Sequence, residues 1–415
     1  MTAARAGNDS GVRDSGTLDS ETPDSETNDV RGRGFASRVA LSIVEEWIDA
    51  SVVPLPPRVV ALADAASALG EGVVLAEPVT APGDWPPADR AARDGVAVVS
   101  SDTLGAGSYN PVPLPGAVTV AAGEPMPPGT DAVLPVEALQ RDGPFAEALG
   151  SAAPGDGVER RGEGVRAGTV LLTAGHRLRP QDVGLLAALG IGTLRIGARP
   201  RVRIVLAGGP RSGPETLSAM LTALVARDGG VVDLVGPLPA DRAALAAAYA
   251  APGADLLIST GRTGVGEDDM APLALADAGE LALHGVALRP GDSAALGRAG
   301  GVPALLLPGE PMACLTAYEL LAGRAVRRLA GRGSALPHPA VAVVTARKLV
   351  SEIGCTELHR LRRTAEGMVE PVASPHRPGL AGAVRADGFV VIPAESEGVP
   401  AGATVTLRCF DGTSL

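Results

Sequence analysis

Residues 255–269 read Asp255-Leu-Leu-Ile-Ser-Thr-Gly-Arg-Thr-Gly-Val-Gly-Glu-Asp-Asp269. The first half is a short apolar run, and the second half is rich in glycine, hydroxyl groups and charge. A short apolar run that does not alternate with polar residues is typical of a strand buried on both faces of a sheet. The segment therefore predicts a buried strand at 255–259 that ends in a glycine-rich turn.

The same arrangement recurs on both sides of this segment. Further strands are predicted at 202–206, 231–235 and 302–307, and they alternate with helices predicted at 215–227, 241–249 and 311–329. Strands and helices that alternate in this way form a parallel sheet covered by helices on both faces. Residues 201–335 are therefore predicted to be a three-layer α/β domain.

Smaller elements flank this domain, so the fold class is multidomain α/β plus β. Residues 35–200 begin with an amphipathic helix and continue through a linker into short strands separated by Gly and Pro, which predicts a small β domain. Residues 336–415 predict a C-terminal β domain with strands at 341–344, 388–392 and 404–407. Residues 1–34 are acidic and almost without large apolar side chains, which predicts a disordered tail whose deletion leaves ligand binding unchanged.

Composition narrows the functional classes. The 415 residues are 46% hydrophobic, their net charge is -11, and Lys348 is the only lysine, so the charge argues against a nucleic-acid partner. The three cysteines and five histidines are dispersed, without the spacing of a zinc site or a redox pair. No apolar run reaches the roughly 18 residues that cross a bilayer. We therefore expect a cytoplasmic protein that does not contact a membrane.

Two loops are candidates for ligand binding, because ligands in parallel α/β sheets lie outside the carboxyl ends of the strands. The second loop contains Pro308, Gly309 and Glu310 and precedes a helix whose first N–H groups attract anions. In the first loop, glycines permit close backbone approach while hydroxyls and an arginine can bind phosphate. A purely structural turn explains such a loop equally well. Its candidate residues are Ser259, Thr260, Gly261, Arg262, Gly264 and Gly266.

Several motifs in one order extend this observation along the chain. Upstream lie Asp84 to Gly95, Gly123 to Val133 followed by Glu137, and Arg160-Arg-Gly-Glu163; downstream of the first loop lie Arg289-Pro-Gly291, Leu307 to Pro311, and Ala386 to Pro393. Together with residues 255–269, these motifs resemble the molybdopterin molybdenumtransferase family from about residue 36 to residue 407. A collinear set of this length is far more specific than any single motif.

The resemblance implies a homodimer of molybdenum cofactor biosynthesis that inserts molybdate into adenylylated molybdopterin, releases AMP, and serves molybdoenzyme or cofactor-synthesis partners. It implies that the two loops, with Pro290 and Gly291, bind the pterin or its phosphate. It also implies that acids of the partner's β domain face the metal or Mg²⁺, although turn-capping acids are the alternative for each carboxylate. The implied catalytic residues are Asp89, Asp94, Glu137, Glu163, Asp269 and Arg289, with Asp89 and Asp94 as metal ligands.

The sequence also departs from the family pattern. The family's Ser-Thr-Gly-Asp reads Leu206-Ala-Gly-Gly209, its Lys-Pro-Gly-Lys reads Arg289-Pro-Gly-Asp292, and an Asn is replaced by Glu310. An acid at position 292 would repel phosphate or molybdate at close range. Three hypotheses follow: an active insertase with a rearranged site, a catalytically impaired protein that binds molybdopterin or delivers the cofactor, and a dimerising scaffold of the same family.

Overall fold

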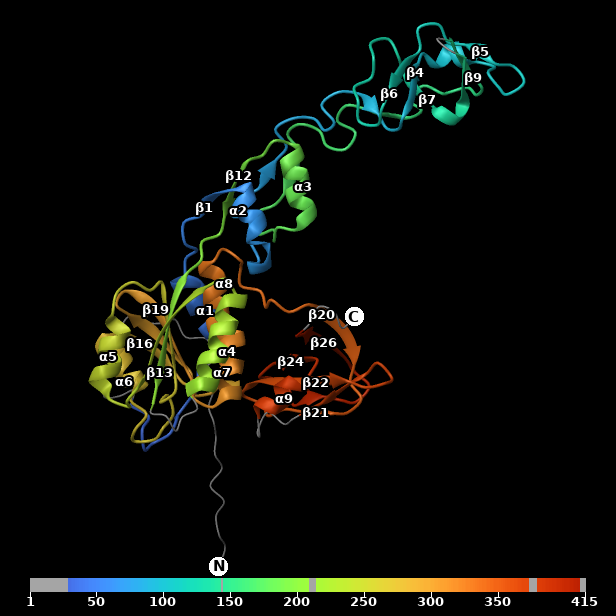
Figure 1. The fold of residues 1–415 in the computed structure, drawn as a ribbon. Helices are drawn as coiled ribbons and strands as arrows, with labels where there is room; N and C mark the ends of the chain where they lie inside the picture. Colours follow the sequence, from blue (N-terminus) through green and yellow to red (C-terminus); the bar gives the residue numbers. More distant parts are fainter. Residues whose placement is uncertain (1–28, 143–144, 209–213, 373–378, 411–415) are drawn as a thin grey trace, which may run out of the picture. The chain divides into compact units, whose positions relative to one another are not determined.

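The computed structural model describes residues 29–142, 145–208, 214–372 and 379–410 (Figure 1). The chain forms two compact units. The first holds the chain up to Arg58, residues 70–72 and the chain from Gly197 onward, and the second holds residues 59–69 and 73–196. The predicted disorder of residues 1–28 and the substitution at Gly209 lie outside the described residues.

The first unit is built on a mixed, mostly parallel sheet with the strand order β14-β13-β15-β19-β18-β16. Strands β14, β13, β15 and β19 are parallel, whereas β18 and β16 are antiparallel. This confirms the predicted α/β domain. The two antiparallel strands were not predicted, because Glu280, His284 and Arg298 interrupt their apolar pattern. In the order of the sheet, the strands span Val231–Leu238, Arg201–Ala207, Leu256–Thr260, Val302–Leu307, Ala295–Ala299 and Gly279–His284.

Helices cover both faces of this sheet, as Figure 1 shows. Helices α5 (Arg242–Ala250) and α6 (Ala271–Ala278) pack on one face through a core of Leu, Ala and Tyr side chains. The other face carries α4 (Pro214–Arg227) and a long helix. That helix begins as α7 (Pro311–Ala317), passes through the π-helical turn η5 (Tyr318–Ala322) and ends as α8 (Gly323–Leu329).

Helix α1 (Leu41–Ser51) belongs to this first unit, although the sequence analysis grouped it with the small β domain. Its side chains Val44 and Ile48 are fully buried in the core that also contains α4 and α8. The guanidinium of Arg324 donates to both carboxylate oxygens of Asp49, at 2.9 and 2.8 Å. The helical period predicts the apolar face of α1, but it cannot specify partners that come much later in the chain.

Residues 29–34 are packed against the α/β domain, whereas composition assigned them to the disordered tail. The backbone N–H of Gly32 donates to the carbonyl oxygen of Val265 at 2.8 Å. Nη1 of Arg31 donates to the carbonyl oxygen of Glu267 at 3.2 Å. Main-chain and arginine contacts hold this segment, so a prediction based on the lack of apolar side chains could not detect it.

A second sheet, with the order β17-β22-β24-β26-β20, forms the predicted C-terminal β domain. Strand β17 (Leu288–Arg289) comes from the α/β domain and pairs in parallel with β22 (Thr356–Arg363). The sequence predicts three strands of this sheet, at 341–344, 388–392 and 404–407, but neither β22 nor the strand contributed from outside the domain. The remaining elements are β20 (Ala340–Val344), β23 (Val369–Pro371), β24 (Gly388–Ile392), β26 (Thr404–Cys409), the pair β21 (Leu349–Val350) and β25 (Gly398–Val399), and α9 (Leu380–Val384).

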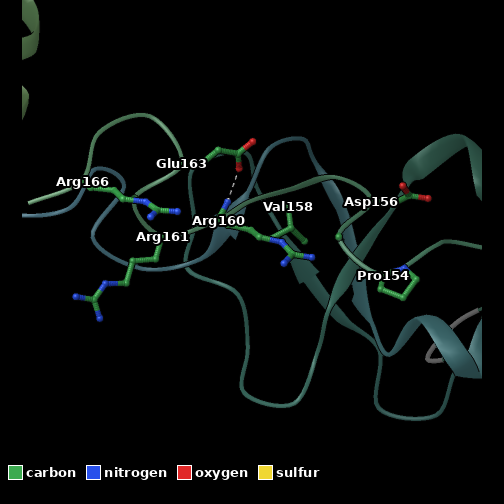
Figure 2. A pocket seen from close by; sticks show the side chains of 9 residues that line it. Pro154, Asp156, Val158, Arg160, Arg161, Glu163 and Arg166 are labelled. Carbon is green, nitrogen blue, oxygen red and sulfur yellow. Dashed lines mark hydrogen bonds between the residues drawn. The ribbon is translucent and has the colours of Figure 1, made fainter. Parts of the chain in front are cut away.

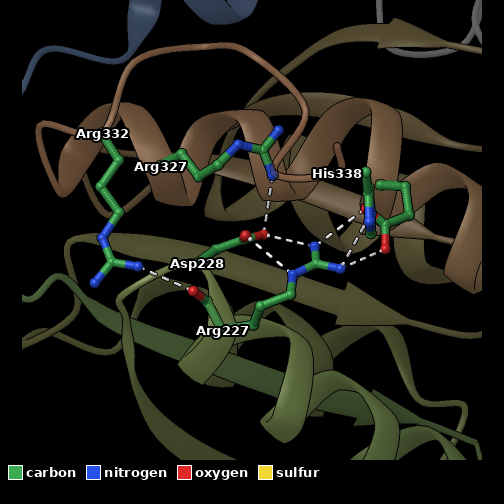
Figure 3. Close-up of polar contacts among 6 residues, drawn as sticks. Arg227, Asp228, Arg327, Arg332 and His338 are labelled. Carbon is green, nitrogen blue, oxygen red and sulfur yellow. Dashed lines mark hydrogen bonds and ion pairs between the residues drawn. The ribbon is translucent and has the colours of Figure 1, made fainter. Parts of the chain in front are cut away.

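A buried network of charged groups joins α4, the long helix and the segment that leads into β20 (Figure 3). Arg227 Nη1 donates to Glu319 Oε1 at 2.6 Å, and His338 Nε2 lies 3.0 Å from Glu319 Oε2. Arg327 Nη1 lies 3.0 Å from Asp228 Oδ2. Buried charges are tolerated when they are paired in this way. The network therefore fixes the segment that carries His338 on the α/β domain.

The second unit contains several small β sheets, as predicted. Its core strands are β4 (Gly95–Val98), β6 (Val118–Val120) and β7 (Ala132–Pro135), paired in the order β6-β4-β7. No helix among the described residues is long and apolar enough to cross a membrane. The other elements are β1 (Arg58–Ala61), β2 (Val79–Thr80), β3 (Arg90–Ala91), β5 (Val112–Pro113), β8 (Leu139–Asp142), β9 (Phe145–Ala148), β10 (Val158–Glu159), β11 (Val170–Leu172), β12 (Thr193–Ile196), α2 (Leu62–Ser67) and α3 (Pro180–Ala188).

Candidate functional site

The two candidate loops lie side by side at the carboxyl ends of β15 and β19. In the sheet register, Thr260 is opposite Leu206 of β13 on one side and Leu307 of β19 on the other. Thr260 Oγ1 donates to the carbonyl oxygen of Pro308 at 3.0 Å, and Gly261 N donates to the carbonyl oxygen of Leu307 at 3.0 Å. These bonds join both loops into one surface at the sheet edge.

The contact between these loops requires glycine at two positions. A Cβ on Gly309 would lie 3.0 Å from the Cα of Gly261, and a Cβ on Gly261 would lie 2.4 Å from the carbonyl oxygen of Ala207. Gly261 also has φ +92°, in the left-handed region that side chains rarely adopt. Both glycines are therefore needed for loop packing, whatever their contact with a ligand.

Two predicted binding residues have side chains that are engaged within the protein. Ser259 is fully buried, and its Oγ lies 2.7 Å from the hydroxyl of Tyr249 in α5. Glu310 is the N-cap of α7, where its Oε2 accepts from the N–H of Ala313 at 2.7 Å. Each of these residues can therefore offer its backbone, but not a free side chain, to a ligand.

The rest of the first loop is closed by Asp269, whose Oδ2 accepts from the N–H of Gly266 at 2.8 Å. A Cβ on Gly264 would lie 2.7 Å from the same carboxylate oxygen, so glycine admits the carboxylate here. Arg262 has φ +60°, and its Nη1 lies 3.7 Å from Asp268 Oδ2. In this structure Asp269 therefore caps a turn.

The turn that follows β17 adds a third segment to the site. Ser293 Oγ lies 3.0 Å from Thr263 Oγ1, which connects the turn containing Pro290 and Gly291 to the first loop. Arg289 Nη1 pairs with Glu352 and lies 3.8 Å from Glu357 Oε1. The positive charge of Arg289 is thus partly balanced by carboxylates of the C-terminal domain.

In the second unit, three predicted acids accept hydrogen bonds from backbone N–H groups. Asp89 accepts from Arg161 N at 2.7 Å, Asp94 from Ala122 N at 2.8 Å, and Glu163 from Arg160 N at 2.8 Å. Glu137 is exposed in the short helix Val136–Ala138. Among the described residues, no group of three or more His, Cys, Asp or Glu side chains could hold a metal ion. The role of Asp89 and Asp94 as metal ligands stays a prediction.

The same unit also has an open groove of about 470 Å³ that the sequence analysis did not predict. Arginines 160, 161 and 166 line it, and Figure 2 shows Glu163 bonded to the backbone of Arg160, with Asp156 and Pro154 further along the groove. Arg161 pairs with Asp84 at 2.6 Å. The arginines between residues 160 and 166 are the feature of the sequence from which this groove could have been predicted. A groove of this charge suits an anion.

Comparisons with family models match consecutive parts of the chain. Three family models match in order: the MoeA N-terminal region (domain I and II) at residues 39–190, a probable molybdopterin binding domain at 197–328, and the MoeA C-terminal region (domain IV) at 342–408. The second model covers the α/β domain that carries the loops described above.

Similar proteins extend over most of the chain. It is 33% identical over 380 residues to molybdopterin molybdenumtransferase 2 of Mycobacterium tuberculosis, covering 80% of this chain and 91% of that one. It is 28% identical over 375 residues to molybdopterin molybdenumtransferase of Haemophilus influenzae, covering 81% and 91%. The crystal structure of the molybdopterin biosynthesis MoeA protein from Pyrococcus horikoshii OT3 superposes with a TM-score of 0.74 at 26% identity, covering 90% of this chain and all of that one. The chain therefore belongs to the MoeA family of molybdenum cofactor biosynthesis proteins, the molybdopterin molybdenumtransferases.

Proposed function

We propose that this protein is a cytoplasmic molybdopterin molybdenumtransferase, which inserts molybdate into adenylylated molybdopterin and releases AMP. The observation that supports this most is the junction of the loops after β15 and β19 with the 289–293 turn, through Thr260, Gly261 and Thr263. This junction lies at the carboxyl ends of the parallel strands, where α/β domains bind anionic ligands. Relatives that carry this activity span most of the chain.

In this proposal, backbone groups bind the ligand and charged side chains stabilise the charge that develops in the reaction. Backbone N–H groups of the two loops would bind the pterin and its phosphate, and Arg289 would stabilise negative charge nearby. Asp89, Asp94, Glu137 and Glu163 are exposed carboxylates, which suit Mg²⁺ held mainly by water and phosphate oxygens. When bound, Mg²⁺ would polarise the phosphoanhydride that is cleaved.

A second function in the same family is a catalytically impaired protein that binds molybdopterin, delivers the cofactor or acts as a dimerising scaffold. It is favoured by the carboxylate of Asp292 in the turn and by the engagement of Asp269 and Glu310 in backbone capping. A carboxylate that caps a turn can still approach a ligand if the turn rearranges. Only a reaction assay separates the two functions.

Calorimetry with adenylylated molybdopterin, followed by measurement of AMP after molybdate and Mg²⁺ are added, tests the proposal. We expect binding and AMP release by the native protein. We expect Glu163→Gln to lower the rate of AMP release by about 10²-fold or more, because it removes a charge from the reacting groups. Binding without AMP release would instead identify a carrier, and the absence of binding would leave the scaffold.

Asp241→Asn is a matched control for this experiment. Like Glu163, Asp241 is exposed and accepts from a backbone N–H three residues away, that of Ala244 at 2.8 Å. If both variants lost activity equally, loss of a turn cap would explain the effect and Glu163 would not act in the reaction.

We also propose that the protein is a homodimer, which sedimentation equilibrium would detect as twice the mass of the chain.

A further inference from the structure

Residues 29–39, which we call the N-terminal strap, lie against the first loop of the candidate site. Gly32 N donates to Val265 O at 2.8 Å. Arg31 Nη1 donates to Glu267 O at 3.2 Å and lies 3.0 Å from the sulfur of Met270. Asp29 orients this arginine, because its Oδ2 lies 2.8 Å from Arg31 Nη2. The strap therefore contacts the backbone of the loop at Val265 and Glu267, and the side chain of Met270 directly after it.

The other end of the strap contacts the segment that leads into the 289–292 turn. Val39 N donates to Gly285 O at 2.9 Å, and Ala287 N donates to Val39 O at 2.7 Å. The ring of Phe35 meets the ring of His284 edge-on, with 4.9 Å between centroids. A Cβ on Gly285 would lie only 2.6 Å from the Phe35 ring, so glycine admits this contact.

These two contacted segments are also bonded to each other. His284 Nε2 lies 2.9 Å from the carbonyl oxygen of Thr263, and Thr263 Oγ1 lies 3.0 Å from Ser293 Oγ. The strap, the first loop and the turn thus form one continuous layer. A displacement of the strap would remove contacts from both ligand-binding segments at once.

The strap also changes the charge of the site. Arg38 Nη2 donates to Asp292 Oδ2 at 2.8 Å, and the two side chains are 26% and 46% exposed. An ion pair with this exposure adds little to folding stability. A lone carboxylate in this turn would repel an anionic ligand, so its neutralisation by Arg38 matters more for binding than for folding.

We propose that the N-terminal strap is part of the ligand site, and that Arg38 is a positioning residue that holds the 289–292 turn and neutralises Asp292 toward an anionic pterin ligand. The identity of that ligand rests on the proposed function. The contacts by which the strap holds the first loop and the 289–292 turn do not depend on it. The sequence analysis predicted that deletion of residues 1–34 leaves ligand binding unchanged. For residues 29–34, this proposal instead predicts that deletion weakens ligand binding.

The test uses full-length protein with Arg38→Gln, Arg38→Lys and the double variant Arg38→Gln/Asp292→Asn. Hydrogen exchange without ligand should show faster exchange at the amides of Val39 and Ala287 in Arg38→Gln. Calorimetry with adenylylated molybdopterin should show roughly tenfold weaker binding, and this loss should shrink at high salt. The double variant should recover most of the affinity, because no uncompensated carboxylate remains, and Arg38→Lys should keep most of it.

Arg203→Gln is the control, since it breaks an ion pair with Asp233 of 2.7 Å in the same sheet, away from the carboxyl ends of the strands. It should alter neither loop exchange nor affinity. Unchanged exchange and affinity in Arg38→Gln would overturn the proposal, and so would a double variant that binds as weakly as the single one. If the native protein does not bind the pterin, the proposed function fails, while the exchange data still decide whether the strap holds the loops.

Discussion

Gly261 belongs to the candidate site, but the packing of the fold already requires glycine at this position. The sequence analysis assigned its lack of a side chain to close approach of a ligand. In the structure, the space for a Cβ is already taken by the carbonyl oxygen of Ala207, 2.4 Å away. The junction of the loops after β15 and β19 thus depends on this glycine even without ligand.

Gly261→Ala should therefore destabilise the protein more than alanine at a glycine with a similar backbone. Gly301 has φ +85° and no atom within 4 Å of its Cβ position, so Gly301→Ala should cost only the backbone penalty of about 1 kcal/mol. Gly261→Ala adds a clash with backbone, which should cost about 2 kcal/mol more. Urea unfolding measures both values, and equal losses would contradict the steric explanation.

Among the secondary-structure elements, β15 connects the candidate site to two other parts of the α/β domain. Its last residues connect to α5 through Ser259 and Tyr249, and to the loop after β19 through Thr260. Thr260 is 1% exposed, and its hydroxyl also lies 3.5 Å from the sulfur of Cys314 in α7. The carboxyl end of this strand therefore holds the loops by side-chain hydrogen bonds as well as by the sheet ladder.

Thr260→Val keeps the shape of the side chain but removes its donor, so the carbonyl oxygen of Pro308 loses a partner. We expect a loss of about 1–2 kcal/mol in the free energy of unfolding. Thr406→Val is the control, because Thr406 is exposed on β26 and the change should be close to neutral there. A Thr260→Val protein as stable as the native one would show that this bond contributes nothing to the junction of the loops.

On the scale of the whole molecule, a network of charged groups around Glu319 joins the α/β domain to the segment that leads into β20. Burial raises the pKa of Glu319, but hydrogen bonds from His338 and Arg227 outweigh it and lower the pKa from 4.5 to about 2. The folded protein therefore stabilises the ionised form of Glu319 relative to its protonated form. His338 extends the network to the C-terminal domain through ring contacts with Phe389 and Phe410.

Because the folded pKa of Glu319 is depressed, its contribution to stability should be complete above pH 4.5 and lost as the pH falls toward 2. The shift corresponds to a contribution on the order of 3 kcal/mol. Glu319→Gln should be less stable at pH 7 and should show a flatter loss of stability between pH 4.5 and 2. Thermal unfolding over this pH range measures it. Parallel pH profiles for the two proteins would mean that another group causes the acid sensitivity.

Local patterns in the sequence were sufficient for the alternating strands and helices of the α/β domain and for the position of the two loops, because burial on both faces leaves an apolar run and tight turns require glycine. They did not reveal α6 and β22, or β16 and β18, whose polar residues hide the pattern, or the packing of α1. For the candidate site, the sequence predicted the loops Ser259 to Asp269 and Pro308 to Glu310, and the structure brings these two loops together.

Only the tertiary structure decided which groups meet: Ser259 with Tyr249, Asp269 with Gly266, and Arg38 with Asp292. Periodicity describes neighbours along a helix or strand, whereas these contacts depend on which distant segments the fold brings together. The N-terminal strap is the clearest case. It has few apolar side chains to mark it as ordered, and it is held by hydrogen bonds to loops more than two hundred residues away along the chain.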